Sequence, residues 1–271
     1  MLLELMRWIK HKAWKRGRRE GAGNILKSKW VLKWKETGLG KDKTRKIKAR
    51  LVAQGFLDQQ MTATFAGTST RWSQRLLLSI AVQMQWSLWS ADISEAFLRG
   101  LSFEQLHLEE GEELRKVELA LPTGSEHLIR TIEGYHDFDP TSEILILLKP
   151  GFGLRDAPRL WLLALKGVLA SIGAVPTKID PQLFFIHRGG KLRVVLSIHV
   201  DDIKLSGETE VMNEVISKLE AHFDTVKLEK DNFIHLGLQH ERLSDGSSRT
   251  TYKNSNPFLM HTSESWTRMH K

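Results

Sequence analysis

Two adjacent aspartates, Asp201 and Asp202, lie between two apolar segments of this 271-residue chain. Apolar residues recur at every second position from Leu192 to Val200 and resume at Ile203, which predicts two strands joined by a tight turn at the acidic pair. Such turns normally contain Asn-Gly, Asp-Gly or Gly. Two neighbouring carboxylates repel each other there, and a bound cation would remove that repulsion. An ordinary exposed turn is the alternative, since aspartate is common in turns.

A third carboxylate, Asp92, ends another predicted buried strand, which runs from Trp86 to Ile93. Phosphoryl transfer with two metal ions requires carboxylates from neighbouring strands, which hold the ions about 3.5 to 4 Å apart. Side chains alternate in direction along a regular strand, so Asp201 and Asp202 cannot both point to one side. We therefore predict Asp92, Asp201 and Asp202 as catalytic, metal-binding carboxylates, with Asp202 as the weaker or supporting ligand.

The composition limits which metal these residues would bind. The chain has no cysteine, which excludes disulfides and thiolate zinc sites, and its 11 histidines include no HExxH-like pair. Any metal must then bind mainly to oxygen atoms, which favours Mg²⁺ or Mn²⁺.

The charge of the chain predicts a polyanionic partner. The formal net charge is +8, and residues 1–50 hold 17 Lys and Arg against 4 Asp and Glu. This concentration favours a surface that binds a phosphate backbone, with a solvated basic segment as the alternative. No apolar segment approaches the roughly 20 residues of a membrane span, and the first residues do not resemble a secretory signal. We expect no membrane partner and an intracellular location, in a cytoplasmic particle or the nucleus.

Several elements must position these residues. Alternating residues predict strands over 28–35 and 45–52, joined by a turn over 38–43, and helical spacing predicts helices over 72–84 and 158–170 and from residue 209. The length suits one large domain or two small lobes.

Four blocks, in order, resemble the reverse transcriptase domain of copia-type retrotransposons: KARLVAQGF (48–56), SADISEAFLRG (90–100), PGFGLRDAPRLW (150–161) and SIHVDDIKLSG (197–207). The resemblance extends from about Trp30 to about Gly237. It implies an α+β fold of the right-handed polymerase kind, with a palm built on a ferredoxin-like sheet with helices, plus fingers. We expect a basic arm (1–23), a fingers-like region (24–85), a palm (86–240) with an insertion at about 102–143, and a polar tail (241–271).

The resemblance also implies roles for single residues. Asp92 and Asp201 fall on the metal-binding aspartates, with Asp202 beside them. Lys48 and Arg50 fall where the fingers hold the incoming triphosphate, a task that suits a bidentate arginine and a point-charge lysine. We expect both to face the carboxylates across a cleft.

The resemblance also implies which residues lie near the sugar and base of the nucleotide. Phe97 falls where similar enzymes exclude a ribose 2′-hydroxyl, with a core aromatic as the alternative reading. The family's usual Gln near the nucleotide is Asp156 here, its usual Tyr in the same block is Phe152, and its usual Tyr before Val-Asp-Asp is His199. Asp156 would either oppose a triphosphate or cap the helix that begins near Pro158.

We therefore expect the RNA-directed DNA polymerase core of a retroelement, which adds deoxynucleotides to a primer 3′-hydroxyl by two-metal nucleotidyl transfer. Its expected partners are an RNA or DNA template, a primer and deoxynucleoside triphosphates. The alternative is a catalytically decayed remnant that still binds nucleic acid. A metal-dependent nuclease would share the carboxylates but would leave the KARLVAQGF and GFGLRDAPRLW blocks unexplained.

Overall fold

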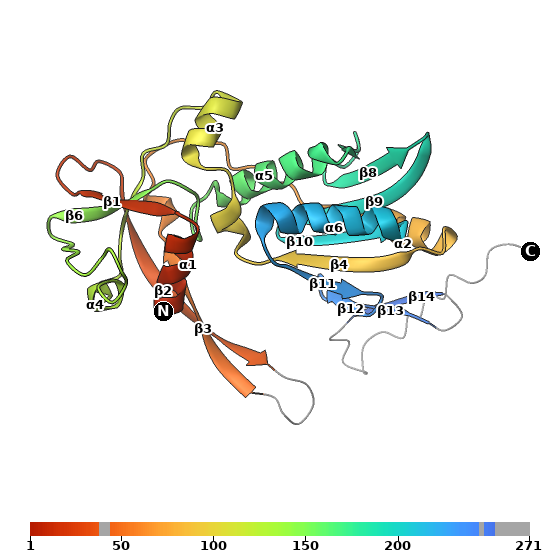
Figure 1. Cartoon of the computed structure of the whole chain (residues 1–271), viewed down its shortest axis with the longest axis horizontal. Coiled ribbons are helices and arrows are strands. Elements are labelled where there is room, and N and C mark those ends of the chain that lie inside the picture. The colour runs from red at the N-terminus through yellow and green to blue at the C-terminus, as the bar shows by residue number, and fades with distance from the viewer. Residues whose placement is uncertain (38–43, 244–246, 253–271) are drawn as a thin grey trace, which may run out of the picture. The chain divides into compact units, whose positions relative to one another are not determined.

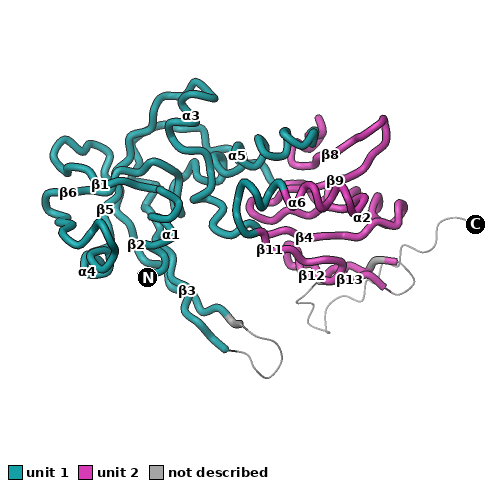
Figure 2. The backbone as a smooth tube through the Cα atoms, in the orientation of Figure 1, with its two compact units in different colours: residues 1–68, 93–175, 218–225 teal, residues 69–92, 176–217, 226–271 magenta. Residues whose placement is uncertain are grey.

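The computed structural model describes residues 1–37, 44–243 and 247–252. They form two compact units, each built from separate stretches of the chain (Figure 2). Unit 1 contains residues 1–68, 93–175 and 218–225, and unit 2 contains residues 69–92, 176–217 and 226–271. The mixture of helices with several sheets is compatible with the expected α+β class.

Unit 1 is organised around a five-stranded sheet in the order β1-β6-β5-β2-β3. Its strands are β1 (Trp14–Arg18), β2 (Ile25–Thr37), β3 (Thr44–Ala53), β5 (Glu118–Ala120) and β6 (Glu143–Leu147). The long hairpin of β2 and β3 extends away from the rest of the unit (Figure 1). This confirms the predicted pair of basic strands, whereas the predicted turn over 38–43 lies outside the described residues.

Residues 1–23 are a folded part of unit 1, not a separate basic arm as the sequence suggested. They form α1 (Leu2–Lys10) and β1, which pairs with β6. Leu5 and Trp8 are completely buried, and Trp8 stacks on Trp14 with ring centroids 5.1 Å apart. The prediction missed this because the basic side chains lie around an apolar face that the core covers.

The predicted insertion also packs into unit 1. It contains α3 (Phe103–Glu110), the strand β5 and α4 (Glu126–Ile129), and it buries Phe103, Leu119 and Ile129 in the core. The same unit holds the short 3₁₀ turns η2 (Gly55–Leu57) and η3 (Ala96–Arg99) and the helix α5 (Ala157–Ser171), close to the predicted helix over 158–170.

Unit 2 is organised around a six-stranded sheet in the order β11-β4-β10-β9-β8-β7. The strands of this sheet are β4 (Ser87–Ile93), β7 (Ala174–Pro176), β8 (Leu183–Arg188), β9 (Lys191–His199), β10 (Asp202–Gly207) and β11 (Val226–Lys230). Ile93, Ala174 and Val175, at strand ends, belong to unit 1. The helix α2 (Arg71–Gln83) packs against β9 and β10. The helix α6 (Thr209–Phe223) begins in unit 2, and its residues from 218 onward belong to unit 1. These elements confirm the predicted helices near 72–84 and after 209.

A smaller three-stranded sheet of unit 2 consists of β12 (Phe233–His235), β13 (Leu238–Arg242) and β14 (Ser248–Tyr252). The predicted polar tail therefore begins with paired strands, and its last part, from residue 253, lies outside the described residues. Among the residues that the structure describes, no helix has the length and apolar character needed to cross a bilayer.

Candidate active site

The carboxylates of unit 2 lie in one row across the sheet. Asp202, the first residue of β10, is directly opposite Asp92 of β4 on one side and His199 of β9 on the other. Residues directly opposite in an antiparallel pair project to the same face with Cβ atoms about 4.5 to 5.5 Å apart. Asp92, Asp202 and His199 therefore share one face of the sheet.

The turn between β9 and β10 differs by one residue from the predicted one. Because His199 pairs with Asp202, the two loop residues are Val200 and Asp201, and Asp202 already belongs to the strand. Val200 has φ 59°, in the left-handed region, which a β-branched residue rarely adopts. Val200 therefore holds a strained backbone conformation, and backbone strain of this kind tends to occur at functional sites.

Charges of both signs act on the Asp202 carboxyl in this row. Burial, followed by the negative charges of Asp201 and Asp92, raises the pKa of the Asp202 carboxyl to about 6, and Lys227 opposes this shift. The opposing lysine is largely exposed and ion-paired with Glu229. Additional positive charge at this row would relieve the repulsion.

The three aspartates offer only oxygen ligands, which fits the expected Mg²⁺ or Mn²⁺. Within the described part of the chain, no three His, Asp or Glu side chains are gathered closely enough to hold a metal ion by themselves. Magnesium in phosphate-transferring sites usually keeps waters and substrate phosphates as further ligands, with one or two carboxylates from the protein. The aspartates therefore fit an ion that arrives with a phosphate substrate.

The predicted nucleotide-binding residues lie in unit 1, and three aromatic and basic side chains meet there. The Arg50 guanidinium of β3 lies over the Phe152 ring, 4.6 Å from its centroid. Phe97 of η3 contacts the same Phe152 ring edge-on, with centroids 5.4 Å apart. Lys48 is on the same face of β3 as Arg50, and burial together with the charges of Arg50 and Lys35 lowers the pKa of its ammonium group.

The backbone fixes Phe152 in this position. The Ala53 N–H, at the end of β3, donates to the Phe152 carbonyl at 2.7 Å. Gly153 has φ 95°, and a Cβ there would lie 2.0 Å from the Ala53 carbonyl oxygen. Only glycine permits this approach of the loop to β3. In the sequence, Phe152 stood out only as a departure from the family pattern, and its contacts were not predicted.

Comparisons with known proteins show what this chain is similar to. Residues 18–115 match the family model described as reverse transcriptase (RNA-dependent DNA polymerase). The chain is 26% identical, over 82% of its length, to the retrovirus-related Pol polyproteins from transposons RE2 and RE1 of Arabidopsis thaliana. It is 27% identical, over 68% of its length, to the corresponding polyprotein from transposon TNT 1-94 of Nicotiana tabacum. The predicted resemblance to copia-type reverse transcriptases is confirmed.

This chain covers only part of those relatives. The matched region is 14% of the RE2 and RE1 polyproteins and 12% of the TNT 1-94 polyprotein. The similarity therefore concerns one region of each polyprotein and not the whole polyprotein. The aspartates predicted to be catalytic are in unit 2, and Lys48, Arg50 and Phe97 are in unit 1. The expectation that both groups face one cleft stays a prediction.

Asp156, which stands where copia-type reverse transcriptases have Gln, is engaged inside unit 1. Its side chain is 1% exposed, and one carboxylate oxygen lies 3.2 Å from the Nε atom of Arg115. Asp156 occupies the N-cap position of α5, but its side chain makes no capping hydrogen bond, so the alternative of a side-chain cap is not confirmed. Burial raises the pKa of the Asp156 carboxyl, and Arg115 opposes that effect.

Two buried cations were missed by the sequence analysis. Arg115 lies in a Glu-rich segment where nothing distinguishes it from its charged neighbours. Lys204 is 1% exposed and stands between Ile203 and Leu205 in β10, and burial lowers its pKa to about 7. A lysine inside an otherwise apolar strand is a signal that was available in the sequence.

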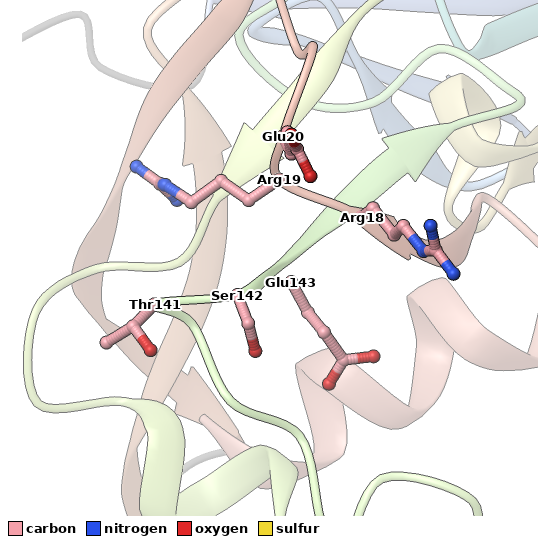
Figure 3. Close-up of a pocket in the computed structure, with 6 residues that line it drawn as sticks. All are labelled: Arg18, Arg19, Glu20, Thr141, Ser142 and Glu143. Atoms are coloured by element: carbon pink, nitrogen blue, oxygen red, sulfur yellow. The ribbon is translucent and has the colours of Figure 1, made fainter.

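A separate hollow in unit 1 contains none of the predicted site residues. It lies where β1 ends opposite the start of β6, and Figure 3 shows its lining by Arg18, Arg19, Glu20, Thr141, Ser142 and Glu143. Glu143 there is bonded to Arg16 through both carboxylate oxygens. The hollow is open and its acidic group is already paired, so we assign it no chemistry.

Proposed function

We propose that this chain is the polymerase core of an RNA-directed DNA polymerase that extends a primer 3′-hydroxyl with deoxynucleotides. The observation that carries the proposal is the row formed by Asp92 and Asp202, next to a strained turn that bears Asp201. In this proposal unit 2 carries the palm sheet, and the β2–β3 hairpin belongs to the fingers. The primer, the template and the nucleotide remain proposed partners.

Each group has a role that its chemistry suits. Asp92, Asp201 and Asp202 would hold divalent magnesium or manganese ions, which when bound stabilise negative charge on the attacking and leaving oxygens. Arg50 would bind the triphosphate with a planar fork of donors, and Lys48 would add a point charge.

The aromatic pair suits the sugar side of the nucleotide. The Phe152 ring restrains the Arg50 guanidinium through a cation–π contact and supports Phe97 from the side. We propose that Phe97 excludes a 2′-hydroxyl, so that deoxynucleotides are preferred. Asp156 takes no part in binding phosphate, because Arg115 already pairs with its carboxylate.

The test is primer extension on an RNA template, with the purified chain, Mg²⁺ or Mn²⁺ and deoxynucleoside triphosphates. We expect extension by the wild type and its loss by at least about 10³-fold in Asp92→Asn and Asp202→Asn, as for removal of a metal-binding catalytic group. Glu220→Gln, an exposed acid on α6, is the matched control and should keep full activity.

Retention of wild-type extension by Asp92→Asn would contradict the assignment of the carboxylates. A wild-type chain that binds a primer–template but never extends it would favour the decayed remnant instead. Salt-sensitive binding alone does not separate the two, because any basic surface on nucleic acid shows it.

A further inference from the structure

Glu95 is a second strained residue, three positions after Asp92. Its backbone has φ 61° and ψ 29°, in the left-handed region. For residues other than glycine that conformation costs about 1 kcal/mol or more, and it persists only where the surroundings enforce it. Glu95 immediately precedes η3, which carries Phe97, so whatever holds Glu95 also sets the direction of that turn.

Both carboxylate oxygens of Glu95 are held by residues of α1 and of its C-cap, His11. The Nε atom of Arg7 lies 2.7 Å from one oxygen, and the Nε2 atom of His11 lies 2.7 Å from the other. Arg7 and His11 are four residues apart and therefore project from the same side of the helix. Burial lowers the pKa of His11, which favours the neutral ring with Nε2–H donating to the carboxylate.

The helix α1 is itself firmly packed. Leu5 and Trp8 are completely buried, and Arg7 makes a second ion pair, at 3.1 Å, with the buried Glu4. A Cβ added to Gly151 would lie 2.0 Å from the Trp8 ring, so this indole covers the start of the loop that carries Phe152. One helix therefore contacts the turn before Phe97 and the loop before Phe152.

We propose that Arg7 and His11 are positioning residues for nucleotide selection: through Glu95 they hold η3 so that Phe97 meets Phe152 and Arg50. This inference rests on the proposed polymerase function and extends it to α1. The matched region of the family model begins at residue 18, after this helix. A released Glu95 would let η3 rotate and move the Phe97 ring away from the position in which it excludes a 2′-hydroxyl.

The experiment compares the ratio of kcat/KM for a deoxynucleotide to that for the matching ribonucleotide in primer extension. We expect Arg7→Gln to lower this ratio by about tenfold, the loss that corresponds to about 1.4 kcal/mol of discrimination. The control is Lys15→Gln, which removes one positive charge from an exposed position of β1 and should leave the ratio unchanged. Lys10 is not used, because its partner Asp224 also pairs with Arg99 of η3.

A second variant separates positioning from folding. Glu95→Asn tolerates the left-handed backbone better than Glu but is too short to keep both contacts with α1. We expect its thermal stability to stay within a few degrees of wild type while the selectivity ratio falls as in Arg7→Gln. A purely structural role for Glu95 would change stability and leave selectivity intact.

The outcomes distinguish this inference from the proposed function. If the wild type extends primers and both Arg7→Gln and Glu95→Asn keep its selectivity ratio, the positioning role is wrong and the polymerase function stands. If the wild type does not extend primers under any metal condition, the proposed function fails and the positioning role fails with it.

Discussion

Arg115 and Asp156 form an ion pair that is almost completely removed from water, with the Nε and Oδ2 atoms 3.2 Å apart and the side chains 2% and 1% exposed. The same guanidinium donates to Asp58 at 2.9 Å, and Asp58 also accepts from Asn24. Arg115 lies over the Phe103 ring, 5.3 Å from its centroid. One arginine of the inserted segment thus compensates two buried acids.

The pair changes what Asp156→Gln should do. An acid facing the nucleotide would repel a triphosphate, and its removal would lower KM. Since the carboxylate is paired with Arg115, we expect no improvement in the nucleotide KM. The unfolding free energy should fall by only about 1 kcal/mol, because Arg115 keeps its pair with Asp58 and burial already disfavours the charged form of Asp156. Urea denaturation and steady-state kinetics on the same variant measure both quantities.

The control for this variant removes both charges. Arg115→Met with Asp156→Gln should be less destabilised than the sum of the two single variants. Arg115→Met alone leaves the buried Asp156 and Asp58 without their arginine, whereas the double variant leaves only Asp58 without it. Additive effects in this cycle would show that Arg115 and Asp156 do not stabilise each other. A KM for the deoxynucleotide that falls tenfold in Asp156→Gln would show that Asp156 acts on the nucleotide after all.

Asp202 provides a prediction about stability without metal. Its folded pKa of about 6 lies above the unfolded value of 3.8, so ionisation costs stability, which is lost as pH rises from about 4 through 6. Asp202→Asn should therefore raise the unfolding free energy at pH 7 by about 1 to 2 kcal/mol while abolishing extension. Magnesium should stabilise the wild type more than this variant. A thermal shift of equal size in both proteins would argue against a cation at Asp202.

The sequence predicted the strands that carry the aspartates because their apolar alternation is a local property. It did not predict the turn correctly. The sequence indicated Asp201 and Asp202 as the two loop residues, because a β-branched residue such as Val200 rarely adopts positive φ. The pairing of His199 with Asp202 shows that the loop residues are Val200 and Asp201. The register of a hairpin is set by contacts along both strands, which outweigh the preference of one residue.

The buried charges were unpredictable for a different reason. Arg115 and Asp156 are far apart in the sequence, and each is ordinary in its own surroundings. Their pairing depends on how the insertion folds back onto α5, and no local pattern encodes that. The burial of Trp8 was missed in the same way, because the surrounding basic residues obscured an apolar helix face that only tertiary packing identifies.

The β12–β13 hairpin should be sensitive to acid. His235 and His240 are each 2% exposed, with ring centroids 6.5 Å apart, and burial followed by the charge of Lys204 lowers the pKa of both to about 3. His199 also lowers the pKa of His235. Because the folded values lie below the unfolded 6.5, this stability is complete above pH 6.5 and is lost as pH falls toward 3. At pH 5, each of the two imidazoles should lower the unfolding free energy by about 2 kcal/mol.

Denaturation by urea at pH 7.5 and pH 5.0 measures this loss. His240→Phe keeps a ring against Phe233, which His240 contacts at 5.1 Å, and should reduce the difference between the two pH values by about 2 kcal/mol. The exposed His187 gives a control, since His187→Gln should leave the difference unchanged. An unaltered pH dependence in His240→Phe would mean that His240 remains solvated in the folded protein.

The strain at Val200 leads to the last prediction. A β-branched residue at φ 59° costs about 1 to 3 kcal/mol, whereas glycine adopts this conformation freely and costs about 0.5 to 1 kcal/mol in unfolded-state entropy. Val200→Gly should therefore raise the unfolding free energy by about 1 kcal/mol, measured by urea denaturation at pH 7. Because Asp201 is the other loop residue, a more flexible turn should hold its carboxylate less firmly, and kcat should fall while KM for the nucleotide changes little. A variant that is less stable than wild type would show that contacts of the Val200 side chain outweigh the strain, and one with unchanged kcat would show that the turn does not position Asp201.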